Sequence, residues 1–291
     1  MSTVDAAGAN GPQFLFLHAN GFPTGVYRQF LTALARFGAV DAPEVINTPG
    51  TVRASRRWPH MTEQTLERIH QLADEQRPLV LVGHSMGGYL SLMAAARARS
   101  QVAAVVLVDS PLVLGWRRPF LESMRLTGLS RYGGPAPIAA RRRFQWNSAD
   151  EARDHLSAKA FCRHWADGVM DDFIEHGLVP AASTGVALRI SREIERDIYA
   201  HLPGRRTFAA YKRLRNQGIP VFLLAGKHSR EMQMAGALHN RQVFQQRLIE
   251  LPAGHLIPME VPQICAEAVG NCVAEVMQTS VQKQDEAVMN P

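Results

Sequence analysis

Short apolar runs alternate along the chain with longer stretches in which apolar residues recur at helical spacing. Each run is continuous and bounded by turn residues, which is typical of a strand buried on both faces of a parallel sheet. The predicted strands are Gln13–Leu17, Pro78–Gly83, Val102–Asp109, Ile219–Gly226 and Arg247–Leu251, with a weaker candidate at Glu44–Asn47. The predicted helices are the stretch from Val26 to Phe37, Met61–Gln76, Tyr89–Arg99, Thr207–Gln217 and about Val261–Met277. This alternation predicts an α/β fold with a mostly parallel sheet and helices on both faces.

The alternation stops between about Pro111 and Arg205, where the sequence shows several helical pieces and no strong strand. We therefore predict a core formed by residues 1–111 and 206–278, interrupted by a helical insertion at 112–205. The polar residues at 279–291 are predicted to form a flexible tail.

The strongest chemical signal is the segment Gly83-His84-Ser85-Met86-Gly87-Gly88, which fits G-x-S-x-G and lies between a predicted strand and a predicted helix. In that context a sharp turn exposes the serine hydroxyl as a nucleophile, and the glycines allow the backbone to pack closely around it. The backbone N–H of Met86, at the start of the helix, is placed to donate to an oxyanion. A turn with a purely structural role is the alternative.

A serine nucleophile needs a base, and His255 is the candidate among the eleven histidines of the chain. It follows the last predicted strand, so we expect it at the same carboxyl edge of the sheet as Ser85. Its alternative role is to cap the last helix.

The elbow, the late histidine and the order of these motifs resemble the α/β-hydrolase superfamily, over about residues 13–111 and 206–278. The resemblance implies that the insertion is a cap. It also implies about six main strands, since only a dozen residues precede the first strong strand. Within the superfamily the chain looks most like hydrolases that begin with an H-A-N-G-F motif, present here as His18-Ala19-Asn20-Gly21-Phe22.

In the superfamily this loop supplies the second oxyanion donor. The resemblance therefore implies the backbone N–H of Asn20, with Gly21 and Phe22 as alternatives. Ala19 replaces the usual glycine, which leaves the identity of the donor open. A turn that only connects strand and helix is the other interpretation of the loop.

The acid departs from the common pattern of the superfamily. The segment after the next-to-last strand reads Gly226-Lys227-His228-Ser229-Arg230-Glu231, so Ser229 stands where an Asp is usual. Asp109, at the end of the preceding strand, is the favoured acid because a strand end is a rigid platform. Glu231, two residues beyond the usual position, is the alternative. A triad without an acid is the third possibility, and it would leave reduced catalysis.

Substrate contacts are expected from His18 and Phe22 of the loop and from Trp146 and Trp165 of the insertion. For the two tryptophans, packing among the helices of the insertion is favoured over this role. The sequence contains no metal-ligand motif, P-loop or dinucleotide fingerprint, so neither a metal nor a cofactor is expected.

Composition and charge change this picture little. The chain of 291 residues carries a formal charge of +6, but its arginines are scattered, which does not favour nucleic-acid binding. The insertion holds 14 Lys and Arg residues against 11 acids, which at most favours anionic substrates. Three cysteines without a CxxC pair, and a start without an apolar signal segment, favour a cytoplasmic location. No run has the length of a membrane span, so the expected partner is a small-molecule substrate and not a membrane, with a homo-oligomer left open.

The residues and the resemblance together predict a serine hydrolase that cleaves a small ester or related acyl substrate through an acyl-enzyme. Among enzymes, the alternatives on the same scaffold are a C–C bond hydrolase, a thioesterase and a lyase. Outside enzymes, the alternative is a ligand-binding protein that has lost catalysis, which only the missing acid after the next-to-last strand favours.

Overall fold

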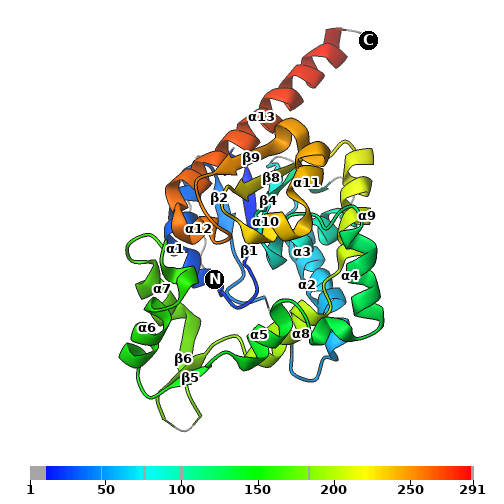
Figure 1. The fold of residues 1–291 in the computed structure, drawn as a ribbon. Coiled ribbons are helices and arrows are strands. Elements are labelled where there is room, and N and C mark those ends of the chain that lie inside the picture. The colour runs from blue at the N-terminus through cyan, green and yellow to red at the C-terminus, as the bar shows by residue number, and fades with distance from the viewer. Residues whose placement is uncertain (1–10, 47, 75–76, 99–100, 183, 290–291) are drawn as a thin grey trace.

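The core of the protein is a six-stranded sheet in the order β2-β1-β3-β4-β8-β9, and every neighbouring pair in it is parallel (Figure 1). The computed structural model describes residues 11–289 apart from 47, 75–76, 99–100 and 183. The strands are β1 (Gln13–Leu17), β2 (Ala39–Asp41), β3 (Leu79–His84), β4 (Ala104–Val108), β8 (Val221–Gly226) and β9 (Leu248–Leu251). The predicted α/β fold with a mostly parallel sheet is therefore confirmed.

The strands direct alternate side chains into two apolar layers. Phe14 and Phe16 of β1 face one layer, while Leu15 and Leu17 face the other. The first layer is covered by α1 (Arg28–Leu34) and α13 (Pro262–Met289), and the second by α2 (Arg57–Leu72), α3 (Met86–Ala95), α9 (Gly204–Asn216) and α11 (Ala237–Phe244). Because both faces are buried, the strands are apolar at successive positions, which is the pattern that made them recognisable in the sequence.

The parallel register brings the carboxyl ends of several strands to one edge of the sheet. His84 at the end of β3 pairs with Val108 of β4, and Val108 pairs with Leu224 of β8. Leu251 at the end of β9 pairs with Gly226. The segments that leave these ends lead into α3, α10 (Arg230–Ala235) and α12 (Ile257–Glu260), so residues far apart in the sequence meet at this edge.

The prediction of a strand at Glu44–Asn47 is wrong, because residues 44–46 are not part of any strand. The strand at the edge of the sheet beside β1 is β2, whose Ala39 pairs with Gln13 of β1. The backbone of residues 44–46 instead serves two loop contacts, because Glu44 O accepts from the Thr24 N–H and the Ile46 N–H donates to His18 Nε2. Asn47 lies outside the described residues.

The insertion between β4 and β8 contains both helices and strands (green in Figure 1). Its helices are α4 (Arg117–Leu126), α5 (Pro135–Arg141), α6 (Ala149–Ser157), α7 (Val169–Gly177) and α8 (Arg192–Ala200). Strands β5 (Gln145–Trp146), β6 (Leu178–Pro180) and β7 (Val186–Leu188) form a small antiparallel sheet in the order β5-β7-β6. The sequence did not reveal these strands, since two or three residues are too few to show an alternating pattern.

Helix α13 continues to Met289 and extends away from the body of the molecule in Figure 1. Residues 279–289 are thus helical in the structure, and residues 290–291 lie outside the described part. The flexibility expected of this tail stays a prediction. The stretch contains no Gly or Pro before Pro291 and several residues of good helix propensity. None of the helices described in the structure combines the length and the apolar composition needed to cross a membrane.

Candidate active site

Ser85 lies at the tight turn between β3 and α3. Its backbone has φ 52° and ψ −110°, and positive φ is uncommon for a residue with a side chain. The Ser85 N–H donates to Val108 O at 3.0 Å, which ties the turn to the end of β4. This is the strand–turn–helix context that the sequence motif predicts.

Two glycines make that turn possible. A Cβ on Gly87 would lie 1.9 Å from the carbonyl oxygen of Leu17, and a Cβ on Gly83 would lie 2.4 Å from the backbone of Gly87. The backbones of β1, the turn and α3 therefore approach one another too closely for any larger residue at these two positions.

His255 lies on the loop after β9 and reaches Ser85. Its Nε2 is 3.1 Å from Ser85 Oγ, and its Nδ1 is 2.7 Å from Asp109 Oδ2. These partners assign the tautomer, because a carboxylate accepts and a serine hydroxyl can donate. Nδ1–H donates to Asp109, and Nε2 accepts the hydrogen bond from Ser85.

Asp109, the first residue after β4, is fully buried and has φ 41°. Its Oδ1 accepts from the Gly226 N–H at 2.8 Å. Its Oδ2 accepts from the Ser229 hydroxyl at 2.5 Å as well as from His255. A buried carboxylate needs such donors, since an unpaired buried charge is strongly destabilising. Of the acids left open by the sequence, Asp109 is the one in direct contact with His255.

Ser229 explains the departure from the usual motif. It occupies the position where the superfamily usually carries its acid, and its hydroxyl donates to the acid that lies on β4. The same oxygen accepts from the Met232 N–H at 3.1 Å and so caps α10. The segment after β8 therefore still contacts Asp109, through a donor rather than a carboxylate.

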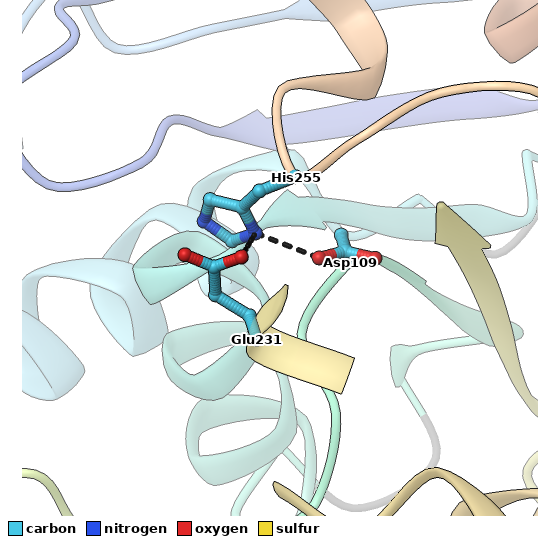
Figure 2. A group of neighbouring side chains, drawn as sticks. All are labelled: Asp109, Glu231 and His255. Carbon is cyan, nitrogen blue, oxygen red and sulfur yellow. Dashed lines mark hydrogen bonds and ion pairs between the residues drawn. The ribbon is translucent and has the colours of Figure 1, made fainter. Parts of the chain in front are cut away.

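Glu231 provides a second carboxylate beside His255, as Figure 2 shows. Its Oε2 is 3.7 Å from His255 Nδ1 and 3.5 Å from Ser229 Oγ, and its side chain is 40% exposed. The ligand-type atoms of Asp109, Glu231 and His255 all lie within 4.8 Å of one another. The hydrogen bond between Asp109 and His255 occupies two of these atoms, so the group fits a catalytic acid–base pair better than a metal site.

The electrostatics of the site raise the pKa of His255. Burial is the largest single effect and lowers this pKa, but the hydrogen bond and charge of Asp109, together with the charges of Glu231 and Glu260, outweigh it. A raised pKa suits a histidine that must hold a proton after taking it from Ser85.

The expected oxyanion donors lie on two segments. Met86 begins α3, directly after Ser85. On the loop after β1, the Phe22 N–H donates to Ala19 O at 3.3 Å, so this N–H is already engaged, while Gly21 has φ 80°. The Asn20 side chain donates to Glu195 O of α8 at 3.0 Å. The backbone N–H of Asn20 as the second oxyanion donor stays a prediction. Of its two alternatives, the Phe22 N–H already donates to Ala19 O, which favours Gly21.

His18, an expected substrate contact, has its side chain hydrogen-bonded to the backbone of nearby loops. The side chain is fully buried, with Nδ1 donating to Ala19 O at 2.7 Å and Nε2 accepting from the Ile46 N–H at 2.6 Å. Burial lowers the pKa of His18 to about 4, so the ring is neutral and both nitrogens serve the backbone. The residue holds the shape of the loop.

A second buried histidine links the parts of the site. Tyr27 Oη accepts from the Ala19 N–H at 2.9 Å and lies 2.8 Å from His84 Nδ1, and His84 Nε2 lies 2.9 Å from His255 O. Burial lowers the pKa of His84 to about 3. The neutral ring of His84 therefore accepts from Tyr27 and donates to His255 O. These bonds connect the loop after β1, the turn at Ser85 and His255. The sequence offered no signal for this chain of contacts.

The two tryptophans differ in their surroundings. Trp146 is 2% exposed and packs against His155 inside the insertion, an arrangement that favours its packing role. Trp165 lies edge-on to Phe22 of the oxyanion loop, with ring centroids 6.3 Å apart, and both contact Phe173. Their contact with substrate stays a prediction.

An ion pair of the insertion lies next to Gly21, in the loop after β1. Arg142 donates to Glu195 at 2.7 Å, and a Cβ on Gly21 would lie 3.1 Å from Glu195 Oε1. Burial raises the pKa of Glu195 despite this partner. Tyr199 of α8 lies close to the side chain of Asn20. The sequence gives no local signal for these residues, because Arg142 and Glu195 are 53 positions apart and Asn20 is 175 positions from Glu195.

Comparison with known proteins agrees with this architecture. A model of the alpha/beta hydrolase family matches residues 14–268. The chain belongs to this family. Lipase LipV of Mycobacterium tuberculosis is 26% identical to it, over 79% of this chain and 81% of the lipase. A Mycobacterium phage protein named as a non-heme haloperoxidase is 34% identical, but the match spans 37% of this chain and only 38% of the phage protein.

Solved structures share the fold of this alpha/beta hydrolase. The structure of E-2-(acetamidomethylene)succinate hydrolase has a TM-score of 0.66 at 19% identity, over 91% of this chain and 92% of that one. At this level of identity the likeness shows the fold, while the chemistry has to be argued from the site.

Proposed function

We propose that this alpha/beta hydrolase is a serine hydrolase that cleaves a small ester or related acyl substrate through an acyl-enzyme. The observation that carries the proposal is the continuous chain from Ser85 Oγ to His255 to Asp109, with steps of 3.1 and 2.7 Å. A hydroxyl becomes a useful nucleophile at neutral pH when an adjacent base takes its proton and a third group orients that base.

The first half of the reaction forms the acyl-enzyme. Ser85 Oγ attacks the carbonyl carbon of the substrate while its proton passes to His255 Nε2. Asp109 stabilises the imidazolium, and the N–H groups of Met86 and Asn20 bind the oxyanion. His255 then gives its proton to the leaving oxygen, so the alcohol departs and the acyl group stays on Ser85.

The second half restores the enzyme. Water gives a proton to His255 Nε2 as its oxygen attacks the acyl carbon. When the tetrahedral intermediate collapses, that proton returns to Ser85 Oγ and the carboxylic acid leaves. Phe22 and Trp165, at the junction of the loop and the insertion, are the proposed contacts for the substrate's apolar part.

The missing acid after the next-to-last strand was the reason to consider a binding protein without catalysis. Asp109 removes that reason, because it meets His255 at hydrogen-bond distance and is itself held by Gly226 and Ser229. The relationship to a lipase over 81% of that protein's length supports acyl chemistry.

A fluorophosphonate probe tests the proposal, since it phosphonylates an activated serine. The parent protein is expected to be labelled and Ser85→Ala to be unlabelled. Ser91→Ala is the matched control, because Ser91 lies on α3 but donates only to Gly87 O, and it should be labelled like the parent. An unlabelled parent, or equal labelling of Ser85→Ala, would refute the proposal.

A further inference from the structure

Helix α4, in the insertion, presents an apolar face to solvent. Trp116, directly before the helix, is exposed, and within it Phe120 is 58% and Leu126 is 72% exposed. Pro119 and Ser123 are exposed as well, and these positions recur at the spacing of one helix face. The run of large exposed apolar side chains continues beyond the helix with Leu129, Tyr132 and Ile138.

Three charged side chains of α4, those of Arg117, Arg118 and Glu122, are only partly exposed. Arg117 packs over the ring of Trp116 at 5.0 Å, and Arg118 packs over Phe208 of α9 at 4.9 Å. A surface helix normally directs its apolar stripe toward the core, as Leu121 and Met124 do here, but α4 has a second apolar face that meets solvent. Figure 1 shows α4 at the outer side of the molecule, next to α9.

The positive charge of the protein is concentrated in the same region. Residues 116–143 contain seven arginines and one carboxylate, Glu122. Arg142 and Arg143 pair with Glu195 and Glu151 outside the segment, which leaves an excess of four positive charges. The neighbouring helix α9 adds five cations and no acid within Gly204–Asn216. The remainder of the chain is therefore net negative, and the exposed apolar face lies within the basic part of the surface.

We propose that residues 116–138 dock the protein on an anionic lipid surface. Exposed Trp, Phe and Leu side chains beside arginines are the combination that places a helix in the interfacial region of a bilayer, with the rings among the acyl chains and the guanidinium groups at the phosphates. This docking does not span the bilayer, and it does not depend on the catalytic role of Ser85.

Charge complementarity favours lipid over a second copy of the chain. A two-fold dimer through α4 would bring the same face of both subunits together. Each face carries the arginine excess of residues 116–143, so like charges would meet. An anionic bilayer instead supplies opposite charge and an apolar phase to one face at once.

Vesicle flotation of the full-length protein tests this docking. The comparison uses vesicles of phosphatidylcholine alone and vesicles of equal parts phosphatidylcholine and phosphatidylglycerol. The protein is expected to bind the anionic vesicles at least about tenfold more strongly, and less at high salt. Trp116 is the most exposed tryptophan, so its emission should shift to shorter wavelength on binding.

The variant Phe120→Ser/Leu126→Ser should lose binding by about tenfold or more. Both side chains are exposed, so its folding should match the parent in thermal unfolding. Ile264→Ser is the matched control, because Ile264 is 44% exposed on α13, which covers the opposite face of the sheet from α9, the neighbour of α4. This control should bind like the parent.

Four results would overturn the proposal. The first is no flotation with either vesicle, and the second is equal binding to both. The third is an equal loss of binding in Ile264→Ser. The fourth is a lipid-free dimer that Phe120→Ser/Leu126→Ser dissociates, which would assign the face to a second copy. If the first result comes with binding to polyglutamate, the face belongs to an acidic protein.

Discussion

Replacing Glu231 by glutamine removes the second carboxylate beside His255 while leaving Asp109 in place. Glu231 Oε2 lies 3.7 Å from His255 Nδ1. At an effective dielectric constant of about 20, two unit charges at such a distance interact by about 4 kcal/mol. Glu231 is 40% exposed, so solvent screening reduces this toward the range of about 0.2–1 kcal/mol found for exposed pairs.

An interaction of that size changes the pKa of His255 by at most about 0.7 units. Glu231 raises this pKa, and the base acts only when neutral, so activity rises as pH increases through the pKa. In Glu231→Gln the acid limb of kcat/KM should therefore move to lower pH by up to about 0.7 units. The plateau should stay within about twofold of the parent, because the bond between Asp109 and His255 remains.

Asp109→Asn should behave differently. An amide in place of the buried carboxylate no longer stabilises the imidazolium and can favour the wrong tautomer, which in serine proteases costs about four orders of magnitude in rate. The plateau of kcat/KM should fall by that order. Glu63→Gln, in an exposed ion pair with Arg97, is the control that should change neither limb nor plateau.

The assay is the pH dependence of ester hydrolysis by the four proteins between about pH 5 and 9, a range that brackets the ordinary pKa of histidine. The assignment of Asp109 as the acid is refuted if Glu231→Gln lowers the plateau a thousandfold while Asp109→Asn retains more than a tenth of it. An acid limb of the parent well below pH 6.5 would contradict the raised pKa of His255.

Two further predictions concern the supports of the site. Gly87→Ala should lower the free energy of unfolding by about 3 kcal/mol or more, because its Cβ would overlap a carbonyl oxygen of β1. Gly50→Ala, with no heavy atom within 4 Å of its Cβ, should change this free energy by less than about 0.5 kcal/mol in the same urea titration, and equal losses would contradict the argument. Tyr27→Phe leaves the buried Ala19 N–H and His84 Nδ1 without their partner, which should cost about 1–3 kcal/mol of stability. It should also lower kcat more than it changes KM, and a variant with unchanged kcat would show that this chain of contacts does not position the site.

The sequence predicts the central sheet well for a physical reason. Strands buried on both faces are apolar at every position, so Gln13–Leu17, β4 and β8 appear as continuous runs. The edge strand β2 and the short strands of the insertion are only two or three residues long, which is too short for any pattern. Their pairing depends on tertiary contacts that no local window contains.

The candidate site divides in the same way. Ser85 and His255 are tied to motifs next to strands, and the structure brings them together. The choice between Asp109 and Glu231 depended on side-chain reach across the sheet edge, which local sequence does not encode. The role of Ser229 as donor to Asp109 could not be predicted, because a serine in that position suggests only that the usual acid is missing. The exposed face of α4 was equally hidden, since an amphipathic pattern does not tell which side meets the core.

In the proposed mechanism Ser85 carries the acyl group during turnover. Intact-mass spectrometry of the protein mixed with an activated ester and quenched before the steady state measures this directly. One added acyl mass is expected, mapped by peptide analysis to Ser85, that disappears as the ester is consumed and is absent in Ser85→Ala. Ester turnover by the parent with Ser85 unmodified at every time, or with the acyl group on another residue, would contradict it.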